Sequence, residues 1–451
     1  MAVSLIVLAA GMGSRMKSDL PKVLHPLAGA PLLAHALAAG RALEPERVVV
    51  VTGHGAEAVG RAARALEPAM EPEVILAHQA EQKGTAHAVA QARDALAGFA
   101  GDALVLYGDT PFVRPETLAA MQAARAGHDI VVLGFHAADP GRYGRLVMDG
   151  DSLERIVEFK DATPAERAIS SCNSGVVCAD ADTLFDLIDA VGNDNASGEY
   201  YLTDIVGIAR ARGLSVGAVI CDEAETLGIN TRAELAAAEA GFQARARAAA
   251  LETGITLIAP ETVHFALDTV IGRDAVIGPN VVFGPGVTIE TGAEIRAFCH
   301  LEGCHVARGA VVGPFARLRP GAELAEDARV GNFVEIKNAI LGEGAKVGHL
   351  SYIGDAEIGD GANIGAGTVT CNYDGVLKHR TVIGPGVFVG SSTMLVAPVT
   401  LGAGAMTGSG SVITEDVPDG ALAVARARQV NKPGLAARLM ARLRAGRTGR
   451  A

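Results

Sequence analysis

The first half of the chain alternates short apolar runs with alanine-rich stretches. The apolar runs are SLIVLAA, RVVVVTG, EVILAH, ALVLYGD and DIVVLGF, and segments such as AVGRAARALEP and GTAHAVAQARDALAG separate them. Short apolar runs favour buried strands, and the segments between them favour helices. This alternation predicts an α/β domain over residues 1–232, with a doubly wound, Rossmann-like mixed sheet.

The sequence changes character after this region. Residues 233–251 read AELAAAEAGFQARARAAAL, and their alanine, glutamate and arginine content predicts a single helix. We therefore expect residues 233–253 to be a helical linker between two domains.

Beyond the linker an apolar residue recurs with a period of six, often followed by glycine. The series is Ile271, Ile277, Phe283, Ile289 and Ile295, then Val312, Leu318, Leu324, Val330 and Ile336, then Ile383, Val389, Leu395 and Leu401. This period fits neither an amphipathic helix nor a hairpin meander. It is typical of a left-handed parallel β-helix of hexapeptide repeats, whose inward residues pack between coils. We predict this fold over residues 254–451, which end in a basic tail with a short helix at LAARLMARLRAG.

Composition narrows the class of function. The length of 451 residues predicts more than one domain, and the net charge of −12 argues against nonspecific binding to nucleic acid or anionic membranes. Six cysteines without a CxxC pair indicate reduced thiols, and the run AVSLIVLAA, with no Lys or Arg before it, indicates a buried strand instead of a signal peptide. We expect a cytoplasmic protein that acts on small molecules, with no nucleic-acid partner and no membrane insertion.

Two segments near the N-terminus suit a phosphate ligand. LAAGMGSRM directly follows the first apolar run, and its glycines can let backbone N–H groups approach a polyphosphate. Its spacing matches neither the Rossmann nor the Walker loop. Lys22, in DLPKVLHPLAG, can supply a cation to the same phosphates. Either segment alone would be better explained as a structural turn or a surface lysine.

Polar residues in the hexapeptide region suggest a second site. Arg319 and Lys337 are 18 positions apart, which places them on adjacent coils of a three-sided solenoid. Two such cations suit a phosphate monoester, although a solvated ladder of charges explains the spacing equally well. His349 is a lone histidine, and a structural role is the better explanation from its position alone. CNYDGVLKHR, residues 371–380, breaks the period of six, and we interpret it as a loop extruded from the solenoid.

Further motifs follow the glycine loop, in the order HQAEQKGTAHA, YGDTPF, RYGRL, VEFKDAT, NSGVV and GINTRAEL. With the hexapeptide region, they resemble the bacterial family of bifunctional N-acetylglucosamine-1-phosphate uridyltransferases and glucosamine-1-phosphate N-acetyltransferases. The resemblance runs from about Ser4 to Arg428. It implies an enzyme that acetylates glucosamine-1-phosphate with acetyl-CoA and then couples the N-acetylglucosamine-1-phosphate to UTP. The products would be UDP-N-acetylglucosamine, for peptidoglycan and lipopolysaccharide synthesis, and pyrophosphate.

The resemblance also implies the residues of the uridyltransferase site. These are Leu8, Ala9, Gly11, Arg15, Lys22, Gln79, Gly84, Thr85, Tyr107, Gly108, Asp109, Gly144, Glu158, Asn173 and Asn230. Gln79, Gly84 and Thr85 would hold the uracil. Asp109 and Asn230 would bind Mg²⁺, because carboxylate and amide oxygens are suitable hard ligands.

For the acetyltransferase site, the resemblance implies that His349 takes a proton from the amine of the sugar, a task that suits imidazole near neutral pH. The sugar phosphate would contact Arg319, Lys337, Tyr352 and Asn363, and acetyl-CoA would contact Ala366, Asn372, Tyr373, Ser391, Ser409 and Arg426. The pocket would form between the subunits of a homotrimer.

Two alternative functions remain open from the sequence. One is a pyrophosphorylase with a single activity, whose β-helix serves only oligomerisation and regulation. The other is a noncatalytic sugar-nucleotide sensor, which would keep the binding loops without needing Asp109, Asn230 or His349. An assay of both half reactions would separate these alternatives.

Overall fold

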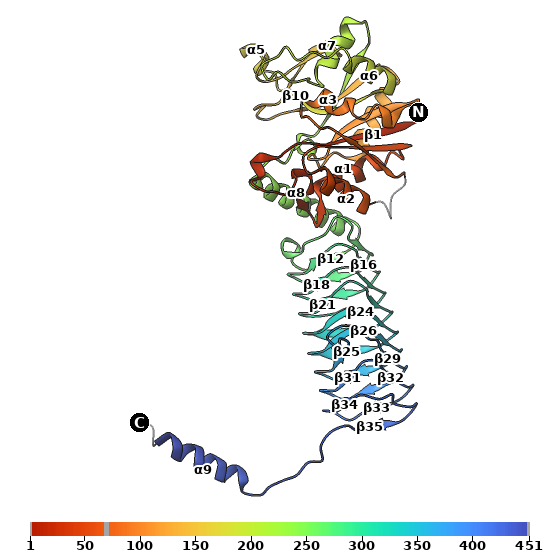
Figure 1. The fold of residues 1–451 in the computed structure, drawn as a ribbon, viewed down its shortest axis with the longest axis vertical. Helices are drawn as coiled ribbons and strands as arrows, with labels where there is room; N and C mark the ends of the chain where they lie inside the picture. Colours follow the sequence, from red (N-terminus) through yellow and green to blue (C-terminus); the bar gives the residue numbers. More distant parts are fainter. Residues whose placement is uncertain (1, 67–71, 449–451) are drawn as a thin grey trace. The chain divides into compact units, whose positions relative to one another are not determined.

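The computed structural model describes residues 2–66 and 72–448. The chain divides into two units between Ala246 and Arg247, within helix α8 (Arg232–Glu252). The helix predicted over residues 233–251 is therefore present. Figure 1 shows an α/β unit before α8 and a stack of short strands after it.

The first unit is built on a mixed sheet, as predicted. Within the described residues it has nine strands, in the order β11-β7-β10-β6-β1-β4-β5 with the hairpin β8–β9 beside β10. The strands are β1 (Val3–Ala9), β4 (Arg47–Thr52), β5 (Val74–His78), β6 (Asp102–Tyr107), β7 (Ile130–His136), β8 (Arg145–Asp149), β9 (Ser152–Val157), β10 (Ser171–Asp180) and β11 (Val216–Cys221), with a separate small pair β2 (Pro26–Leu27) and β3 (Ala30–Pro31). Pairing is parallel except around β10 and within the β8–β9 hairpin.

Both faces of this sheet are covered, which explains why its central strands are continuously apolar. On β1, Ile6 belongs to one core cluster while Leu5 and Val7 belong to another. The helices are α1 (Leu32–Arg41), α2 (Ala56–Ala65), α3 (Thr85–Ala90), α4 (Pro115–Ala124), α5 (Pro164–Arg167), α6 (Ala181–Ile188) and α7 (Asp204–Ala211).

One predicted helix is shorter than expected. The stretch GTAHAVAQARDALAG forms α3, then a turn, then a 3₁₀ helix at Asp94–Leu96. Ala92, Leu96 and Phe99 are all buried in the same core cluster. Packing of these side chains therefore overrides the helix propensity of the alanines.

The second unit is the predicted left-handed parallel β-helix of hexapeptide repeats. Its ten-stranded sheet, counted over the described residues, contains β12 (Thr256–Leu257), β14 (Val276–Ile277), β17 (Glu294–Ile295), β20 (Val311–Val312), β23 (Arg329–Asn332), β25 (Lys346–His349), β27 (Asn363–Ile364), β30 (Phe388–Val389), β33 (Met406–Thr407) and β35 (Leu422–Ala423). The remaining strands form a second sheet with fourteen strands in the same described ranges: β13 (Val270–Ile271), β15 (Val282–Phe283), β16 (Val287–Ile289), β18 (His300–Leu301), β19 (Cys304–Val306), β21 (Arg317–Leu318), β22 (Ala322–Leu324), β24 (Glu335–Leu341), β26 (Tyr352–Ile358), β28 (Val369–Cys371), β29 (Thr381–Ile383), β31 (Met394–Val396), β32 (Val399–Leu401) and β34 (Val412–Ile413).

The period of six corresponds to the inward-facing positions of this stack. Four examples have 0% of their surface exposed: Ile277, Leu318, Ile336 and Leu395. Burial of each such side chain contributes roughly 1.5–3 kcal/mol, so the series supplies most of the core. The chain ends in helix α9 (Leu435–Thr448), which includes the predicted LAARLMARLRAG. Across the described residues, every helix is too short or too polar to span a membrane.

Candidate functional site

A hollow of about 300 Å³ opens at the carboxyl ends of β1 and β6 in the α/β unit. This is the edge at which open α/β sheets bind ligands. Its lining includes the predicted residues Leu8, Ala9, Gly11, Lys22, Gln79, Gly84, Thr85, Tyr107 and Asp109. Gly108 packs close by, since a Cβ there would lie 3.2 Å from the carbonyl oxygen of Leu8. Sequence reasoning missed the lining residues Ala10, Val23, Gln82, Ala88 and Glu199.

The glycine loop brings Lys22 to this hollow. Gly13 has a φ of +61°, and a Cβ there would lie 2.5 Å from the Cβ of Lys22. Only glycine permits both the turn and the close approach. Met16, in the short 3₁₀ helix that follows, is 1% exposed and ties the loop to the core.

Two cationic side chains and two side chains that carry oxygen acceptors converge beside the hollow. Lys22 Nζ forms an ion pair with Asp109 and donates a hydrogen bond of 3.0 Å to Oδ1 of Asn230. Arg15 Nη2 donates to the same Oδ1 at 2.8 Å. The structure thus brings together Asp109 and Asn230, the two predicted metal ligands. A carboxylate and an amide oxygen around one shared cation form a donor set that fits a hard divalent ion.

Gln79, Gly84 and Thr85 form another part of the lining. Gln79 is buried, and its Nε2 donates to the carbonyl of Gly84 at 3.1 Å. Gly84 has a φ of +120°, and a Cβ there would lie 2.4 Å from the carbonyl oxygen of Tyr200. Thr85 Oγ1 accepts a hydrogen bond of 2.9 Å from the backbone N–H of Leu202. Backbone contacts therefore fix this polar edge of the hollow.

Tyr107 lies between the hollow and a second group of predicted residues. Its ring packs on Gly175, where a Cβ would lie 2.6 Å from a ring carbon. Burial, and then the carboxylates of Asp109 and Glu158, raise the pKa of Tyr107. Its hydroxyl therefore stays protonated at neutral pH and can donate a hydrogen bond.

The second group consists of Gly144, Glu158 and Asn173. The N–H of Asn173 donates to the carbonyl of Gly144 at 2.9 Å, and a Cβ at Gly144 would lie 3.4 Å from Oε1 of Glu158. A hollow of about 380 Å³ adjoins this group, lined by Arg142, Glu158, Phe159, Lys160, Ser197 and Tyr201. Sequence reasoning missed the lining residues other than Glu158, although Arg142, Phe159 and Lys160 belong to the motifs RYGRL and VEFKDAT.

Glu158 is a partly desolvated carboxyl group of this site. Burial raises the pKa of Glu158, a hydrogen bond from Thr203 opposes that change, and Asp204 and Asp161 add to it. The Glu158 side chain therefore lies beside the hollow with part of its hydration removed.

The β-helix has a hollow of about 410 Å³ on the face formed by its ten-stranded sheet. The lining includes the predicted residues His349, Asn363, Ala366 and Ser391. It also includes Arg296, Arg329 and Lys346, which sequence reasoning missed. One column of outward side chains on successive coils consists of Arg329, Lys346 and Asn363, which pair in register. Comparing polar residues one coil length apart in the sequence would have found them.

His349 is exposed at the end of β25 and is oriented by a neighbour on the previous coil. Asn332 is its register partner, and the amide Oδ1 of Asn332 is hydrogen-bonded to Nδ1 of His349. An amide oxygen only accepts, so Nδ1 donates this hydrogen bond, and in the neutral imidazole the lone pair is then on Nε2. Asn332 is thus a hydrogen-bonding neighbour of His349 that sequence reasoning missed.

Arg319 and Lys337 lie on adjacent coils, as their spacing predicted. The N–H of Arg319 donates to the carbonyl of Ile336 at 2.9 Å, and its Nη1 donates to Glu335 Oε1 at 2.9 Å. Contact with the Lys378 ammonium, followed by burial and by Arg319, lowers the pKa of Lys337. Three cations therefore converge here, and Lys378 comes from the interrupting loop.

The interrupting loop is anchored by Asn372. This side chain is 7% exposed, and its Nδ2 donates to Oδ2 of Asp355. Asn338 Nδ2 donates to the other oxygen of Asp355 at 2.6 Å. Burial alone would raise the pKa of Asp355, but these two amides, with Lys378 and Lys337, lower it overall. Tyr373, the next residue, is 60% exposed.

The remaining predicted residues lie further along the stack or on its other face. Arg426 Nη1 donates to the carbonyl of Ser409 at 2.8 Å, which brings these two together. Tyr352 is the register partner of Glu335 in the fourteen-stranded sheet of the described chain. His349 and Tyr352 therefore stand on two different faces, separated by the corner at Leu350, which has a φ of +52°.

These two hollows, one on a nucleotide-binding type of α/β sheet and one on a hexapeptide β-helix, define a two-domain transferase. Residues 5–176 match the MobA-like NTP transferase domain, and residues 268–303 and 380–415 match the bacterial transferase hexapeptide repeats.

Similar proteins extend over nearly the whole chain. "Bifunctional protein GlmU" of Cereibacter sphaeroides is 72% identical over 99% of this chain and 97% of its own length. The protein of the same name from Ruegeria pomeroyi is 70% identical over 99% and 98%, and that from Paracoccus denitrificans is 69% identical over 98% and 98%. The chain belongs to the family of bifunctional GlmU proteins. It is accordingly an enzyme with uridyltransferase and acetyltransferase activities in cell-envelope precursor synthesis, which confirms the function predicted from the sequence.

The half-buried carboxyl of Glu158 leads to a prediction about pH. Its pKa in the folded state is raised above the ordinary value of 4.5, so the stability it contributes is lost as pH rises through the raised pKa. Relative to wild type, Glu158→Gln should therefore gain free energy of unfolding from acid to neutral pH. Urea unfolding curves between about pH 4 and 8 measure this difference.

Glu166→Gln provides a control of opposite sign. Hydrogen bonds from Thr163 and Arg155 lower the pKa of Glu166 to about 2. The relative stability of this variant should fall as pH rises between about 2 and the ordinary pKa of 4.5, so its unfolding curves are extended to about pH 2. A difference for Glu158→Gln that does not change with pH would contradict the role of burial.

Proposed function

We propose that the α/β hollow transfers uridyl from UTP to N-acetylglucosamine-1-phosphate and that the β-helix acetylates glucosamine-1-phosphate with acetyl-CoA. The observation that carries the first assignment is the convergence of Arg15 and Lys22 on Asp109 and Asn230. An attack of one phosphate on another brings anions together, so the reaction needs cations and positioning more than a protein nucleophile.

In this proposal each part of the α/β site has one task. Gln79, Gly84 and Thr85 hold the uracil, and the backbone at Leu8, Ala9 and Gly11 faces the ribose and phosphates. Arg15 and Lys22 offset phosphate charge. Gly144, Glu158 and Asn173 bind the amino sugar, with Tyr107 between sugar and nucleotide.

The family uses a divalent metal, and we propose that it is Mg²⁺ held by Asp109 and Asn230. Bound there, the ion would offset charge on the phosphates. Two protein ligands are typical of Mg²⁺, because substrate oxygens and water complete its shell. The ion pair of Lys22 with Asp109 supports this assignment, since it shows that the carboxylate side chain is directed at a cationic position.

Asp109→Ala should abolish uridyl transfer and leave acetyl transfer near the wild-type rate, because the acetyltransferase residues all lie after residue 318. The two half reactions are assayed separately, and calorimetry measures Mg²⁺ binding in the presence of UTP. Asp182→Ala, an exposed carboxylate on α6, is the matched control. Unchanged uridyl transfer in Asp109→Ala would refute the metal assignment.

For acetyl transfer we propose that His349 is the general base. A glucosamine amine is largely protonated at neutral pH and must lose that proton before its lone pair can attack the thioester. Nε2 of His349 can accept it, because the hydrogen bond to Asn332 keeps the hydrogen on Nδ1. Arg319 and Lys337 would bind the sugar phosphate, with Tyr352 and Asn363 on the sugar.

Acetyl-CoA would occupy the rest of the β-helix site. The proposed contacts are Ala366, Asn372, Tyr373, Ser391, Ser409 and Arg426. Ala366 and Ser391 line the same hollow as His349, which supports this placement. Because Asn372 is buried against Asp355, its contribution would be to hold the loop that presents Tyr373.

His349→Ala should slow acetyl transfer by about 10² to 10⁴ while sparing uridyl transfer. Asn332→Ala should lower the rate less and shift its pH profile, because the imidazole loses its oriented tautomer. His305→Ala, a half-exposed histidine paired with Glu290 outside the hollow, is the control. If a folded His349→Ala enzyme acetylates near the parent rate, His349 is not the base and Tyr352 becomes the next candidate.

We further propose that the enzyme is a homotrimer that assembles through the β-helix. Phe298, Phe315 and Phe333 stack on successive coils with ring centroids 4.9 and 5.2 Å apart, yet each is about half exposed. We call these three stacked rings the aromatic ladder. Leu350, which is next to His349 in the chain, occupies the corresponding position on the next coil and has 63% of its surface exposed. A contiguous exposed apolar strip of this kind is typical of a subunit interface. A neighbouring copy at this corner would also bring new groups to His349.

Phe315→Ser combined with Phe333→Ser should reduce the assembly to monomers and abolish acetyl transfer, with uridyl transfer retained. Sedimentation velocity measures the mass, and both half reactions are assayed. Ile258→Ser, which alters another apolar residue that is 63% exposed, should leave the mass unchanged. A trimer that persists in the double variant would contradict an interface at the aromatic ladder.

The domain limits remain a proposal: residues 1–232 for uridyl transfer, 233–253 as helical linker and 254–451 for acetyl transfer. The separation into units within α8 supports it. We also propose a cytoplasmic location, since all six cysteines are free thiols, as expected of a reducing compartment.

A further inference from the structure

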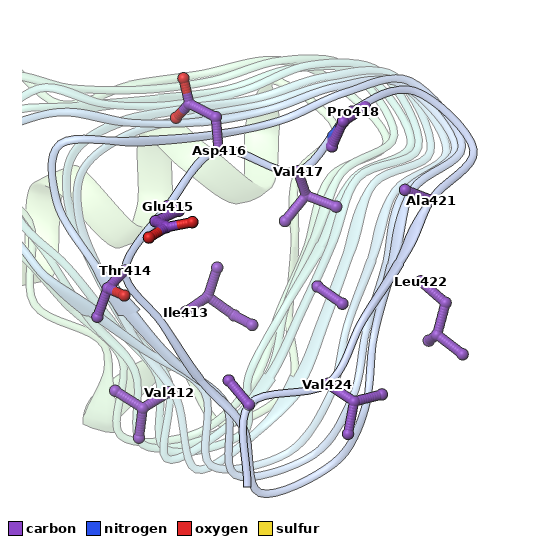
Figure 2. A pocket seen from close by; sticks show the side chains of 12 residues that line it. Val412, Ile413, Thr414, Glu415, Asp416, Val417, Pro418, Ala421, Leu422 and Val424 are labelled. Carbon is purple, nitrogen blue, oxygen red and sulfur yellow. The ribbon is translucent and has the colours of Figure 1, made fainter.

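The last coil of the β-helix carries a hollow of about 270 Å³ with a mixed apolar and polar lining. Its lining is Val412, Ile413, Thr414, Glu415, Asp416, Val417, Pro418, Ala421, Leu422, Ala423, Val424 and Ala425. Leu422 is 64% exposed and Val424 56%. Figure 2 shows Ile413 and Val417 pointing into the space within the coil, with Glu415 and Asp416 beside it. Solenoids normally close their end coils with a polar cap, because each coil is otherwise covered only by the next.

The edge of this hollow is acidic. Oδ1 of Asp416 accepts a hydrogen bond of 2.7 Å from the N–H of Thr400, and Oδ1 of Asp419 accepts one of 2.8 Å from the N–H of Ala403. These two carboxylates are therefore held in place, and Glu415 lies next to them in the chain. An occupant that matched the hollow would carry apolar side chains flanked by cations.

Helix α9 has that combination of side chains. Leu435, Leu439 and Leu443 recur every four residues and so share one face, with Leu439 50% and Leu443 69% exposed. Arg438 and Arg442 border this face. After Asp419 the chain contains eight Lys or Arg residues and no Asp or Glu. A helix of fourteen residues is marginally stable alone in water, so it gains stability by packing its apolar face.

We infer that α9 folds back onto the hollow of its own chain and caps the end of the β-helix. The leucine face would cover Leu422 and Val424, and the arginines would meet Glu415, Asp416 and Asp419. A nucleic acid would use only the arginines, whereas this hollow uses both kinds of side chain.

The connection permits this docking. Ala425 is tied to the last coil by a hydrogen bond of 3.1 Å from the N–H of Val412 to its carbonyl. The nine residues from there to α9 can span about 30 Å, more than the roughly 21 Å length of the helix. Pro433 and Gly434, with a φ of +72° at Gly434, provide a turn at the start of α9. Tethering raises the effective concentration of α9 at its own coil above that of any other copy.

Hydrogen–deuterium exchange of the full-length protein tests the cap. In wild type, amides of α9 should exchange at least about tenfold more slowly than in Leu439→Asp/Leu443→Asp, and residues 412–425 should lose protection in that variant as well. Glu415→Lys should weaken protection of α9 in the same direction. Ala441→Asp, which adds a carboxylate to the opposite face, is the matched control and should keep the protection. Unchanged protection of the coils before Met394 verifies that the β-helix of each variant is folded.

The other outcomes overturn the inference in distinct ways. Equal exchange of α9 in wild type and the double aspartate variant would mean that the helix does not dock. Protection that disappears on dilution would identify a second copy as the partner. Protection that arises only with phosphatidylglycerol vesicles, or only with duplex DNA, would identify a membrane surface or a nucleic acid instead.

Discussion

The parallel register between successive coils is the constraint on which the second half of the molecule depends. Leu318 pairs with Ile336, and Ile336 with Ile353, so every inward position is covered by the same position of the next coil. The same register places outward residues in columns. It sets Asn332 beside His349 and Glu335 beside Tyr352, and it stacks the three phenylalanines. The core and the proposed acetyltransferase site are thus consequences of one repeat.

The α/β unit reaches a comparable result by a different route. Its site residues come from segments far apart in the sequence, and the carboxyl ends of β1 and β6 bring them to one edge of the sheet. Glycines allow the close contacts at this edge, because a Cβ at Gly13 would clash with Lys22 and a Cβ at Gly84 would clash with the backbone of Tyr200. Charge is balanced locally, because Lys22 faces both Asp109 and Asn230. A phosphate ligand would enter a site that already contains matched cations and oxygen donors.

The fold was predictable because the apolar residues that build its core form patterns that recur along the chain. Buried strands such as β1 and β6 are continuous apolar runs, and the inward positions of the β-helix repeat every six residues. The exception, the shortened α3, arises because the side chains of Ala92 and Leu96 pack into the core. The motifs also predicted residues that line the two hollows, such as Lys22, Asp109 and His349. Asn332, Lys378 and Asp355 were missed because their significance depends on register and loop path, which local sequence does not display.

The repeat accommodates the loop at residues 371–380 without losing the pairing between coils. Leu341 pairs with Ile358, 17 positions later, whereas Ile358 pairs with Ile383, 25 positions later. The stack therefore continues in register while the additional residues leave it. Such a loop needs a fixed base, and Asp355 provides one by accepting hydrogen bonds from Asn338 on one coil and Asn372 in the loop. The hydrogen bonds from those two amides oppose the effect of burial on the pKa of Asp355. The loop is thereby fixed to the stack at its base, and it holds Lys378 against Lys337.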